Sequence, residues 1–242
     1  MARSFYHEHP DTLTVETEIA DAQPGRVLLA QSPFYPGGGG QVADRGLVRA
    51  TGGEFAVAGF ESVGGKLWHL LNDPSAILTG TVQAAVDPVF RQMMRELHTD
   101  THILNALVFQ SFNGALVTGV QMNEDGTARM DFDVPGADND KLRALEGPIN
   151  DMIRQNLAVR DDYVPVDDAY DQPGLIRSKS VTPPPTLDGK IRIVEIVGLD
   201  RQACGGTHLG STGPSRAIRI LKIENKGRHN RRMRIGLAGS PP

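Results

Sequence analysis

The sequence predicts an α+β protein, with a small β-barrel-like domain over residues 1–87 followed by an α+β metal-binding domain over residues 88–242. Short alternating or β-branched segments, separated by PG, GG and NDP turns, fill the first part and favour a small barrel or sandwich. A long helical pattern then begins at Asp87-Pro88. After it, helical and strand-like segments mix, which is typical of the α+β class.

In the first domain we expect strands at TLTVETEIA, RVLLAQ, FAVAGFESV and GTVQAAV. The long helix should have Asp87 as its N-cap and Pro88 in its first turn, and it should end at Asn113-Gly114. Its apolar residues recur at a spacing of about 3.6, and they include Phe90, Met94, Leu97, Leu104 and Leu107.

In the second domain the segments ALVTGVQM and ARMDFDV, joined by NEDG, predict a hairpin. A second helix is expected over residues 139–158, and the Pro- and Asp-rich residues 159–190 are predicted to be irregular. The remaining segments are predicted to be a strand at IRIVEIV, a loop at GLDRQACGGTHLGSTG, and strands at RAIRILKIE and RRMRIGLA.

The composition indicates an ordinary globular protein, with 39% hydrophobic and 22% charged residues. No apolar run approaches the length of about 20 residues that spans a membrane, and the N-terminal residues do not read as a secretory signal. A single cysteine excludes an internal disulfide and fits a reducing compartment, so we expect a cytoplasmic protein without membrane contact. The sequence does not indicate an oligomeric state.

The net charge of −4 gives no overall attraction to nucleic acid, so a contact with RNA requires a local basic patch. Eight basic residues lie between Arg216 and Arg234, against Glu224 alone. The segment KGRHNRR gathers several of them around a glycine turn and favours phosphate binding. The alternative is a solvated pair of edge strands.

Two motifs offer metal ligands, HTDTH with His98 and His102, and CGGTH with Cys204 and His208. A spacing of four places both histidines of the first motif on one helix face. Three imidazoles and one thiolate suit a zinc ion, one per chain. The alternative is that Cys204 and the histidines are ordinary core residues. A closed four-ligand shell is typical of structural zinc, so a hydrolytic role requires one loose ligand or a fifth position.

A third motif, FYPGGGGQVADRG, runs from Phe34 to Gly46. Its glycines allow the backbone to approach a ligand closely with its amide donors exposed. It lacks the Lys-Ser/Thr end of a P-loop, so we expect no nucleotide triphosphate there. A flexible hairpin turn is the alternative.

Together HTDTH, CGGTH and GGGQ-x-x-D-x-G resemble the free-standing alanyl-tRNA editing proteins of the AlaX type. These are similar to the editing domain of alanyl-tRNA synthetase and, more distantly, to that of threonyl-tRNA synthetase. The resemblance extends from Phe34 to about Leu237. It implies a trans-acting aminoacyl-tRNA deacylase that hydrolyses serine, and sometimes glycine, from alanine tRNA. It also implies that the four residues of the two metal motifs are zinc ligands.

On this resemblance the expected nucleophile is a metal-bound water. Gln41 and Thr207 are candidates for the pocket. The predicted substrate-binding residues are Gly38, Gly39, Gly40, Gln41, Gly205, Gly206 and Thr207. The predicted tRNA-phosphate ligands are Lys226, Arg228, Arg231 and Arg232. Asp100, Asn105 and Pro214 depart from the family pattern. We expect Asp100 to lie on the helix surface, pointing away from the metal, and the alternative is that it tunes the pocket for an unusual amino acid.

Three alternatives remain open at the level of sequence. A zinc hydrolase of a small ester or amide would share the metal ligands but would need no basic patch. A noncatalytic zinc-containing tRNA-binding module would keep the fold without turnover. An editor of another mischarged tRNA, such as threonine or proline tRNA, would share every feature above.

Overall fold

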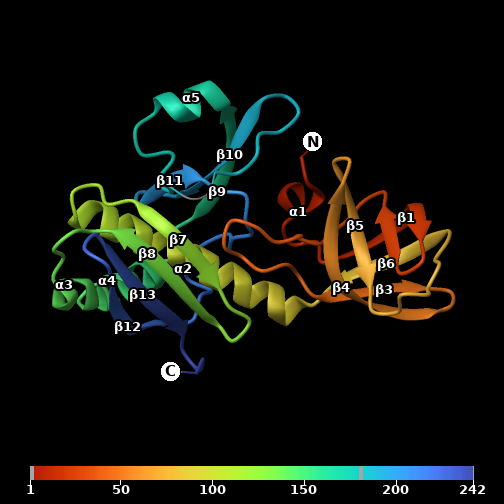
Figure 1. The fold of residues 1–242 in the computed structure, drawn as a ribbon, viewed down its shortest axis with the longest axis horizontal. Helices are drawn as coiled ribbons and strands as arrows, with labels where there is room; N and C mark the ends of the chain where they lie inside the picture. Colours follow the sequence, from red (N-terminus) through yellow and green to blue (C-terminus); the bar gives the residue numbers. More distant parts are fainter. Residues whose placement is uncertain (1–2, 180–181, 242) are drawn as a thin grey trace. The chain divides into compact units, whose positions relative to one another are not determined.

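The computed structural model describes residues 3–179 and 182–241, and in it the chain forms two compact units. The first unit comprises the residues up to Gly38 and Ala43–Gln92, and the second comprises Gly39–Val42 and the residues from Met93 onward. The predicted α+β class with a barrel in the N-terminal part is confirmed (Figure 1). The predicted boundary at residues 87 and 88 stays a prediction, because a compact unit is not by itself a separately folding domain.

The first unit is built around a closed barrel of strand order β1-β2-β5-β4-β3-β6. Closure pairs every strand on both sides and leaves no free sheet edge. The strands alternate inward apolar and outward polar side chains, so that Val27, Val48, Val82 and Ala84 fill the interior, and Phe34 from the loop after β2 packs with them. After the short helix α1 (Phe5–Glu8), the strands are β1 (Thr14–Gln23), β2 (Arg26–Leu29), β3 (Gly46–Ala50), β4 (Gly53–Val63), β5 (Lys66–Leu71) and β6 (Thr81–Val86).

Helix α2 (Pro88–Ser111) follows the barrel, as predicted. The side chain of Asp87 accepts hydrogen bonds from the backbone amides of Val89, at 2.9 Å, and Phe90, at 3.1 Å. These bonds satisfy two of the free amides at the helix start. The predicted cap at Asp87 is therefore confirmed.

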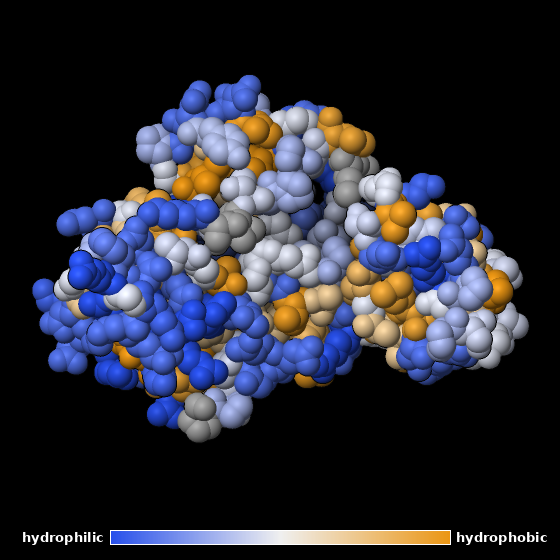
Figure 2. Space-filling view, in the orientation of Figure 1, coloured by the Kyte–Doolittle hydropathy of each residue, from blue (hydrophilic) through white to orange (hydrophobic). Residues whose placement is uncertain are grey.

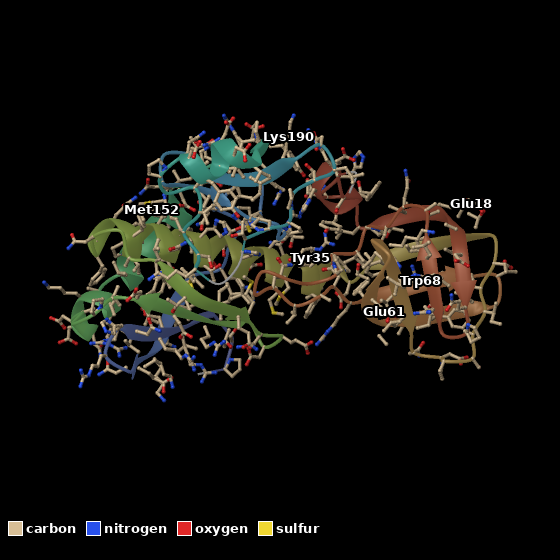
Figure 3. The ribbon with its side chains drawn as sticks, turned by 45° about the horizontal axis from the view of Figure 1, so that its top comes forward. Glu18, Tyr35, Glu61, Trp68, Met152 and Lys190 are labelled. Atoms are coloured by element: carbon tan, nitrogen blue, oxygen red, sulfur yellow. The ribbon has the colours of Figure 1, made fainter. Side chains whose placement is uncertain are left out.

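A buried ion pair fixes the base of the glycine motif within the first unit. The Arg91 guanidinium contacts the Asp44 carboxylate, and their side chains are 1% and 0% exposed. Arg91 also donates to the Pro33 carbonyl at 2.8 Å, and Asp44 accepts the amide hydrogen of Tyr35 at 2.6 Å. Tyr35 is labelled in Figure 3. Residues 35 and 44 are thereby held together, and the glycines between them form a loop.

The second unit contains two antiparallel sheets. The larger sheet has the order β12-β13-β8-β7, and the smaller one has the order β11-β10-β9. Two short helices, α3 (Asn139–Arg143) and α4 (Glu146–Arg154), pack against β12, and α5 (Val166–Asp171) packs against β9 and β10. The strands are β7 (Val117–Met122), β8 (Thr127–Asp133), β9 (Val159–Pro165), β10 (Lys190–Ile196), β11 (Asp200–Ala203), β12 (Ile218–Lys226) and β13 (Asn230–Leu237).

The single helix expected over residues 139–158 is wrong, because α3 and α4 are separate. Pro148 explains the break, since in a continuous helix its ring would collide with the carbonyl of Ala144. The helical stretch also ends early, where Asn156 adopts a φ of 52°.

The prediction of an irregular segment over residues 159–190 is also wrong, since it contains β9 and α5. Asp161 and Asp162 disfavour a strand locally, but β9 pairs with β10 along its whole length. Likewise, the loop predicted before CGGTH contains β11, which pairs with β10 on its other side. Pairing with an apolar neighbour therefore overrides local propensity in both segments.

Within residues 3–179 and 182–241 no helix is both long and apolar enough to cross a membrane.

Replacing Arg91 with Met should destabilise the protein by about 3–5 kcal/mol, because it leaves the buried Asp44 carboxylate unpaired. Replacing Arg49 with Met is the matched control. Arg49 pairs with Glu54 at 2.6 Å on the surface, and its loss should cost less than about 1 kcal/mol. Urea unfolding measures both, and equal costs for the two variants would contradict this account of the buried pair.

Burial lowers the pKa of His69 from 6.5 to about 4. Its Nε2 lies 2.7 Å from the Ser32 hydroxyl, and the residue is 1% exposed. In the unfolded chain the His69 imidazole is protonated below about pH 6.5, whereas in the folded chain it is protonated only below about pH 4. The free energy of unfolding should therefore fall as the pH decreases from 6.5 to 4. At about 1.4 kcal/mol for each pH unit, the loss approaches about 3 kcal/mol.

Urea unfolding at pH 7.5 and 4.5 tests this expectation. His69→Gln should show a smaller loss of stability than the wild type over that range, whereas the exposed His9→Gln should lose as much as the wild type. An identical pH dependence in His69→Gln would rule His69 out as its source.

Candidate metal centre

Four predicted ligands come together in the second unit. His98 and His102 project from one face of α2, while Cys204 and His208 lie in the loop that follows β11. One donor atom from each residue lies within 4.8 Å of all the others, and all four residues are buried. The Cys204 sulfur is 3.3 Å from Nε2 of His98 and 3.3 Å from Nε2 of His208. The group could therefore hold one metal ion.

The separations between donors fit a shared ion. Bonds of about 2.0–2.3 Å in a tetrahedral arrangement place a sulfur and a nitrogen ligand about 3.6 Å apart. The observed separations of 3.3 Å are close to this value. A thiol and three imidazoles that converge on one point suit a metal better than they suit an ordinary packed core.

Each imidazole has a polar side chain beside its second nitrogen, and for His102 this is a charge contact that does not meet hydrogen-bond geometry. Nδ1 of His98 is 2.8 Å from Oε1 of Gln41, and Nδ1 of His208 is 3.4 Å from the Thr99 hydroxyl. Nδ1 of His102 is 3.3 Å from Oδ2 of Asp200. Such outer partners orient ligand histidines and leave the other nitrogen free to bind metal.

The contacts of Gln41 determine which nitrogen of His98 carries hydrogen. Oε1 of Gln41 accepts the backbone amide hydrogen of Thr207 at 3.0 Å, which identifies this atom as the oxygen. The Gln41 amide nitrogen in turn donates to the Thr207 hydroxyl at 2.8 Å. Nδ1 of His98 must therefore be the donor in its bond to Oε1, and the lone pair on Nε2 points toward Cys204.

The charges inside the group favour a thiolate. Burial would raise the pKa of the Cys204 thiol, but His98, His208 and His102 lower that pKa well below its ordinary value. Burial also lowers the pKa of His102, yet Cys204 and Asp200 outweigh it and raise the pKa to about 9. Thiolate is the form of cysteine that binds metal, and binding would displace the proton of His102.

Close packing explains one glycine of CGGTH and one of the glycine loop. A Cβ on Gly206 would collide with the ring of His98 and would lie 2.9 Å from Oε1 of Gln41. A Cβ on Gly40 would lie 2.7 Å from the carbonyl of Val120, and the φ of Gly40 is 85°. Only glycine fits either position, so the loop carrying Gln41 lies directly against β7.

The other predicted residues are distributed as follows. Arg231 is 9% exposed, and Arg232 makes two hydrogen bonds with the Asp131 carboxylate at 2.7 and 2.8 Å. Lys226 and Arg228 are exposed at the turn between β12 and β13. Gly39 and Gly40 belong to the second unit with Gln41, while Gly38 belongs to the first. A Cβ on Gly205 would lie 3.3 Å from Pro183. The predicted phosphate contacts stay predictions.

The expectation that Asp100 lies on the helix surface is wrong. Its side chain is 0% exposed and accepts a hydrogen bond from the Ser215 hydroxyl at 2.7 Å. Asp100 lies two residues from each ligand histidine, which turns it to the opposite side of α2. There it links the helix to the segment that follows CGGTH.

The sequence did not reveal the residues that brace the ligands. Asp200 holds Arg177 at 2.6 Å and Gln202 at 2.6 Å while it faces His102. Arg192 donates to the carbonyls of Cys204, at 3.1 Å, and Gly206, at 3.0 Å, and so fixes the ligand loop. The only available signal was the position of Asp200 four residues before Cys204.

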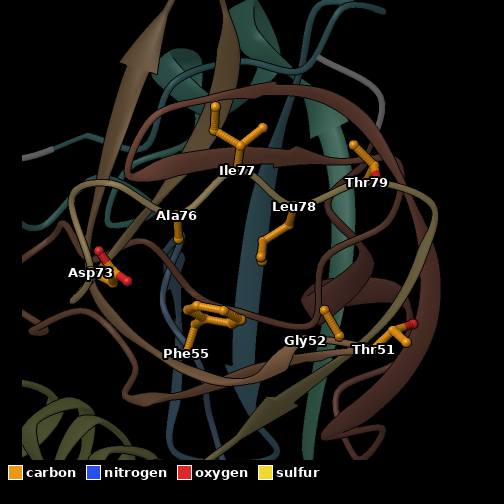
Figure 4. Close-up of a pocket in the computed structure, with 9 residues that line it drawn as sticks. Thr51, Gly52, Phe55, Asp73, Ala76, Ile77, Leu78 and Thr79 are labelled. Carbon is orange, nitrogen blue, oxygen red and sulfur yellow. The ribbon is translucent and has the colours of Figure 1, made fainter.

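A separate hollow of about 340 Å³ lies in the first unit (Figure 4). Phe55, Ile77 and Leu78 give it an apolar side, and Thr51 and Thr79 give it a polar one. It contains none of the predicted site residues.

The chain matches two families of known domains. Residues 5–89 match the class II (A) tRNA synthetases, and residues 191–234 match the second additional domain of threonyl and alanyl tRNA synthetases. The second match contains Cys204 and His208. The fold and site thus define a protein of the class that shares this synthetase domain.

The family follows from relatives of similar length. The chain is 34% identical to the alanyl-tRNA editing protein AlaX-M of Methanosarcina acetivorans over 86% of both chains. It is 32% identical to the AlaX-M protein of Saccharolobus solfataricus over 96% of this chain and 98% of that one. It is also 32% identical to the alanine–tRNA ligase of Pyrococcus furiosus, over 92% of this chain but 24% of the ligase. The chain belongs to the AlaX-M family of alanyl-tRNA editing proteins.

Asp200→Asn should weaken the binding of a divalent metal ion about 10- to 100-fold, because it removes the carboxylate beside His102. Competition with a chromophoric chelator measures the affinity. Asp167→Asn, at an exposed position on α5, is the control and should bind as the wild type does. Unchanged affinity in Asp200→Asn would show that His102 does not need this partner.

Proposed function

We propose that this protein is a trans-editing hydrolase that deacylates mischarged tRNA, with Ser-tRNA(Ala) as its substrate and one zinc ion per chain. The observation that carries the proposal is the position of Gln41, which binds both His98 and Thr207. This contact supports a pocket that Gln41 shares with the predicted metal ligands. Membership of the AlaX-M family supports tRNA as the substrate class.

Zinc is the proposed ion because three imidazoles and one thiolate suit a borderline-soft divalent cation. When bound, zinc supplies Lewis acidity toward the ester. The lowered pKa of Cys204 favours the thiolate that binds metal, and the side chains beside the histidines orient the imidazole rings toward the ion.

Thr207 is the proposed contact for the seryl group. Its hydroxyl oxygen accepts from Gln41, so the hydroxyl hydrogen must point elsewhere and can be donated to a substrate. Its backbone amide is occupied by the same Gln41. Both bonds immobilise the hydroxyl, and a fixed donor favours a substrate that carries an oxygen where alanine has only hydrogen.

Deacylation of Ser-tRNA(Ala), Gly-tRNA(Ala) and Ala-tRNA(Ala) tests the proposal. The wild type should release serine faster than alanine, by about 10⁴-fold in the most selective case. Cys204→Ala should lose both metal and activity. Thr207→Val should keep its metal but lose much of the preference for serine, because the cluster is intact and the hydroxyl is gone.

Each alternative has its own outcome in this assay. Hydrolysis of small serine esters as fast as of Ser-tRNA would identify a small-ester hydrolase. A folded, metal-loaded protein that binds tRNA without turnover would identify a binding module. Activity on charged threonine or proline tRNA alone would replace the proposed substrate with another tRNA.

A further inference from the structure

The larger sheet of the second unit has one buried and one exposed face. Along β8 and β13 the side chains of Met130, Phe132, Met233 and Ile235 are buried. The residues between them point to the opposite, exposed face, because side chains alternate along a strand. Figure 2 shows a mostly hydrophilic surface over β7, β8 and β13.

On this exposed face three cations occupy one row across three neighbouring strands. Arg234 of β13 is paired in register with Lys222 of β12 on one side and with Arg129 of β8 on the other. Since neighbouring strands lie about 4.8 Å apart, the row spans about 10 Å. We call Lys222, Arg234 and Arg129 the cationic row.

The next row along the same strands has a different composition. There Arg232 lies between Glu224 and Asp131, and it binds the Asp131 carboxylate through two hydrogen bonds. Two carboxylates thus offset the charge of Arg232 in this row, whereas the cationic row contains no carboxylate of its own. Lys222 is 3.2 Å from Glu224, but no carboxylate contacts Arg129 or Arg234 within the described part of the chain.

Like charges directly opposite each other destabilise a sheet. In addition, Nε of Arg129 is buried and has no hydrogen-bond partner among the residues that the structure describes. A buried donor without an acceptor costs stability as well. A bound anion on the exposed face would relieve the first cost, since its charge offsets the repulsion among the three cations.

We propose that the cationic row binds the phosphate backbone of tRNA. This inference rests on the proposed function, which supplies the RNA. It locates the main contact on the exposed face of the sheet rather than at the turn between β12 and β13. A nucleic-acid duplex carries about one charge per 1.7 Å of its axis, so several phosphates can face a row of about 10 Å.

The test measures binding of uncharged alanine tRNA to the full chain as a function of KCl concentration. The variants are Arg129→Gln, Arg234→Gln and the double variant. Each substitution should reduce the slope of log Kd against log salt by about 1, and the double variant should bind about tenfold more weakly at 100 mM KCl. An unrelated tRNA should lose as much, because phosphate contacts carry no sequence information.

The control is the double variant Arg26→Gln/Arg49→Gln, which removes the same charge from the barrel, where both arginines pair with surface glutamates. It should bind tRNA as the wild type does. The thermal midpoint of Arg129→Gln/Arg234→Gln should rise by about 1–3 °C, because repulsion is removed. A lower midpoint would indicate that the row serves folding and would overturn the proposal.

Two further outcomes would overturn the cationic row as an RNA site. One is an unchanged slope in Arg129→Gln/Arg234→Gln. The other is that Arg129→Gln/Arg234→Gln binds tRNA as the wild type does but binds phosphatidylserine vesicles more weakly than the wild type, which would assign the row to a lipid surface. The proposed function fails separately, if the wild type binds tRNA through the row but hydrolyses no mischarged tRNA. If the wild type hydrolyses Ser-tRNA(Ala) with the same KM as the double variant, only the row fails.

Discussion

The carboxamide oxygen of Gln41 accepts two hydrogen bonds, and the arrangement of the metal ligands depends on both. One bond fixes the amide of Thr207, inside the loop that carries Cys204 and His208. The other fixes the hydrogen on Nδ1 of His98. Gly206 completes the contact, because any side chain there would collide with the same imidazole. A single neutral group thus sets both the position of the ligand loop and the tautomer of a ligand, without adding charge to a buried site.

The features that the sequence predicted correctly depend on residues that lie close together along the chain. The cap at Asp87 and the placement of His98 and His102 on one helix face depend on helix geometry alone, so both follow from a few residues. The partners Asp200 and Thr99 could not be predicted in this way. Their role depends on which strand and which helix turn face the histidines after folding, and polar residues of this kind are common in any sequence.

The strands that prediction missed show the same limit. The segment at Asp161 and Asp162 is polar, and only its pairing with β10 makes it a strand. The sheet face provides a second case, because β12 has an irregularity between Ile220 and Lys222 that shifts its register against β13. That extra residue turns Lys222 toward Arg234. A count of basic residues reveals a positive segment, whereas the register decides which of them share a face.

The distance along the chain between the two halves of the metal centre has a consequence for folding. His98 and Cys204 are separated by 106 residues, yet their donor atoms lie 3.3 Å apart. An ion held between them is a cross-link that closes a long loop, and such a link removes more conformational freedom from the unfolded chain than a local one does. During synthesis the link cannot form until His208 has emerged, after nearly all of the strands have been made. An ion bound by all four residues could therefore link the two segments only after His208 has been made, when β12 and β13 are still to follow.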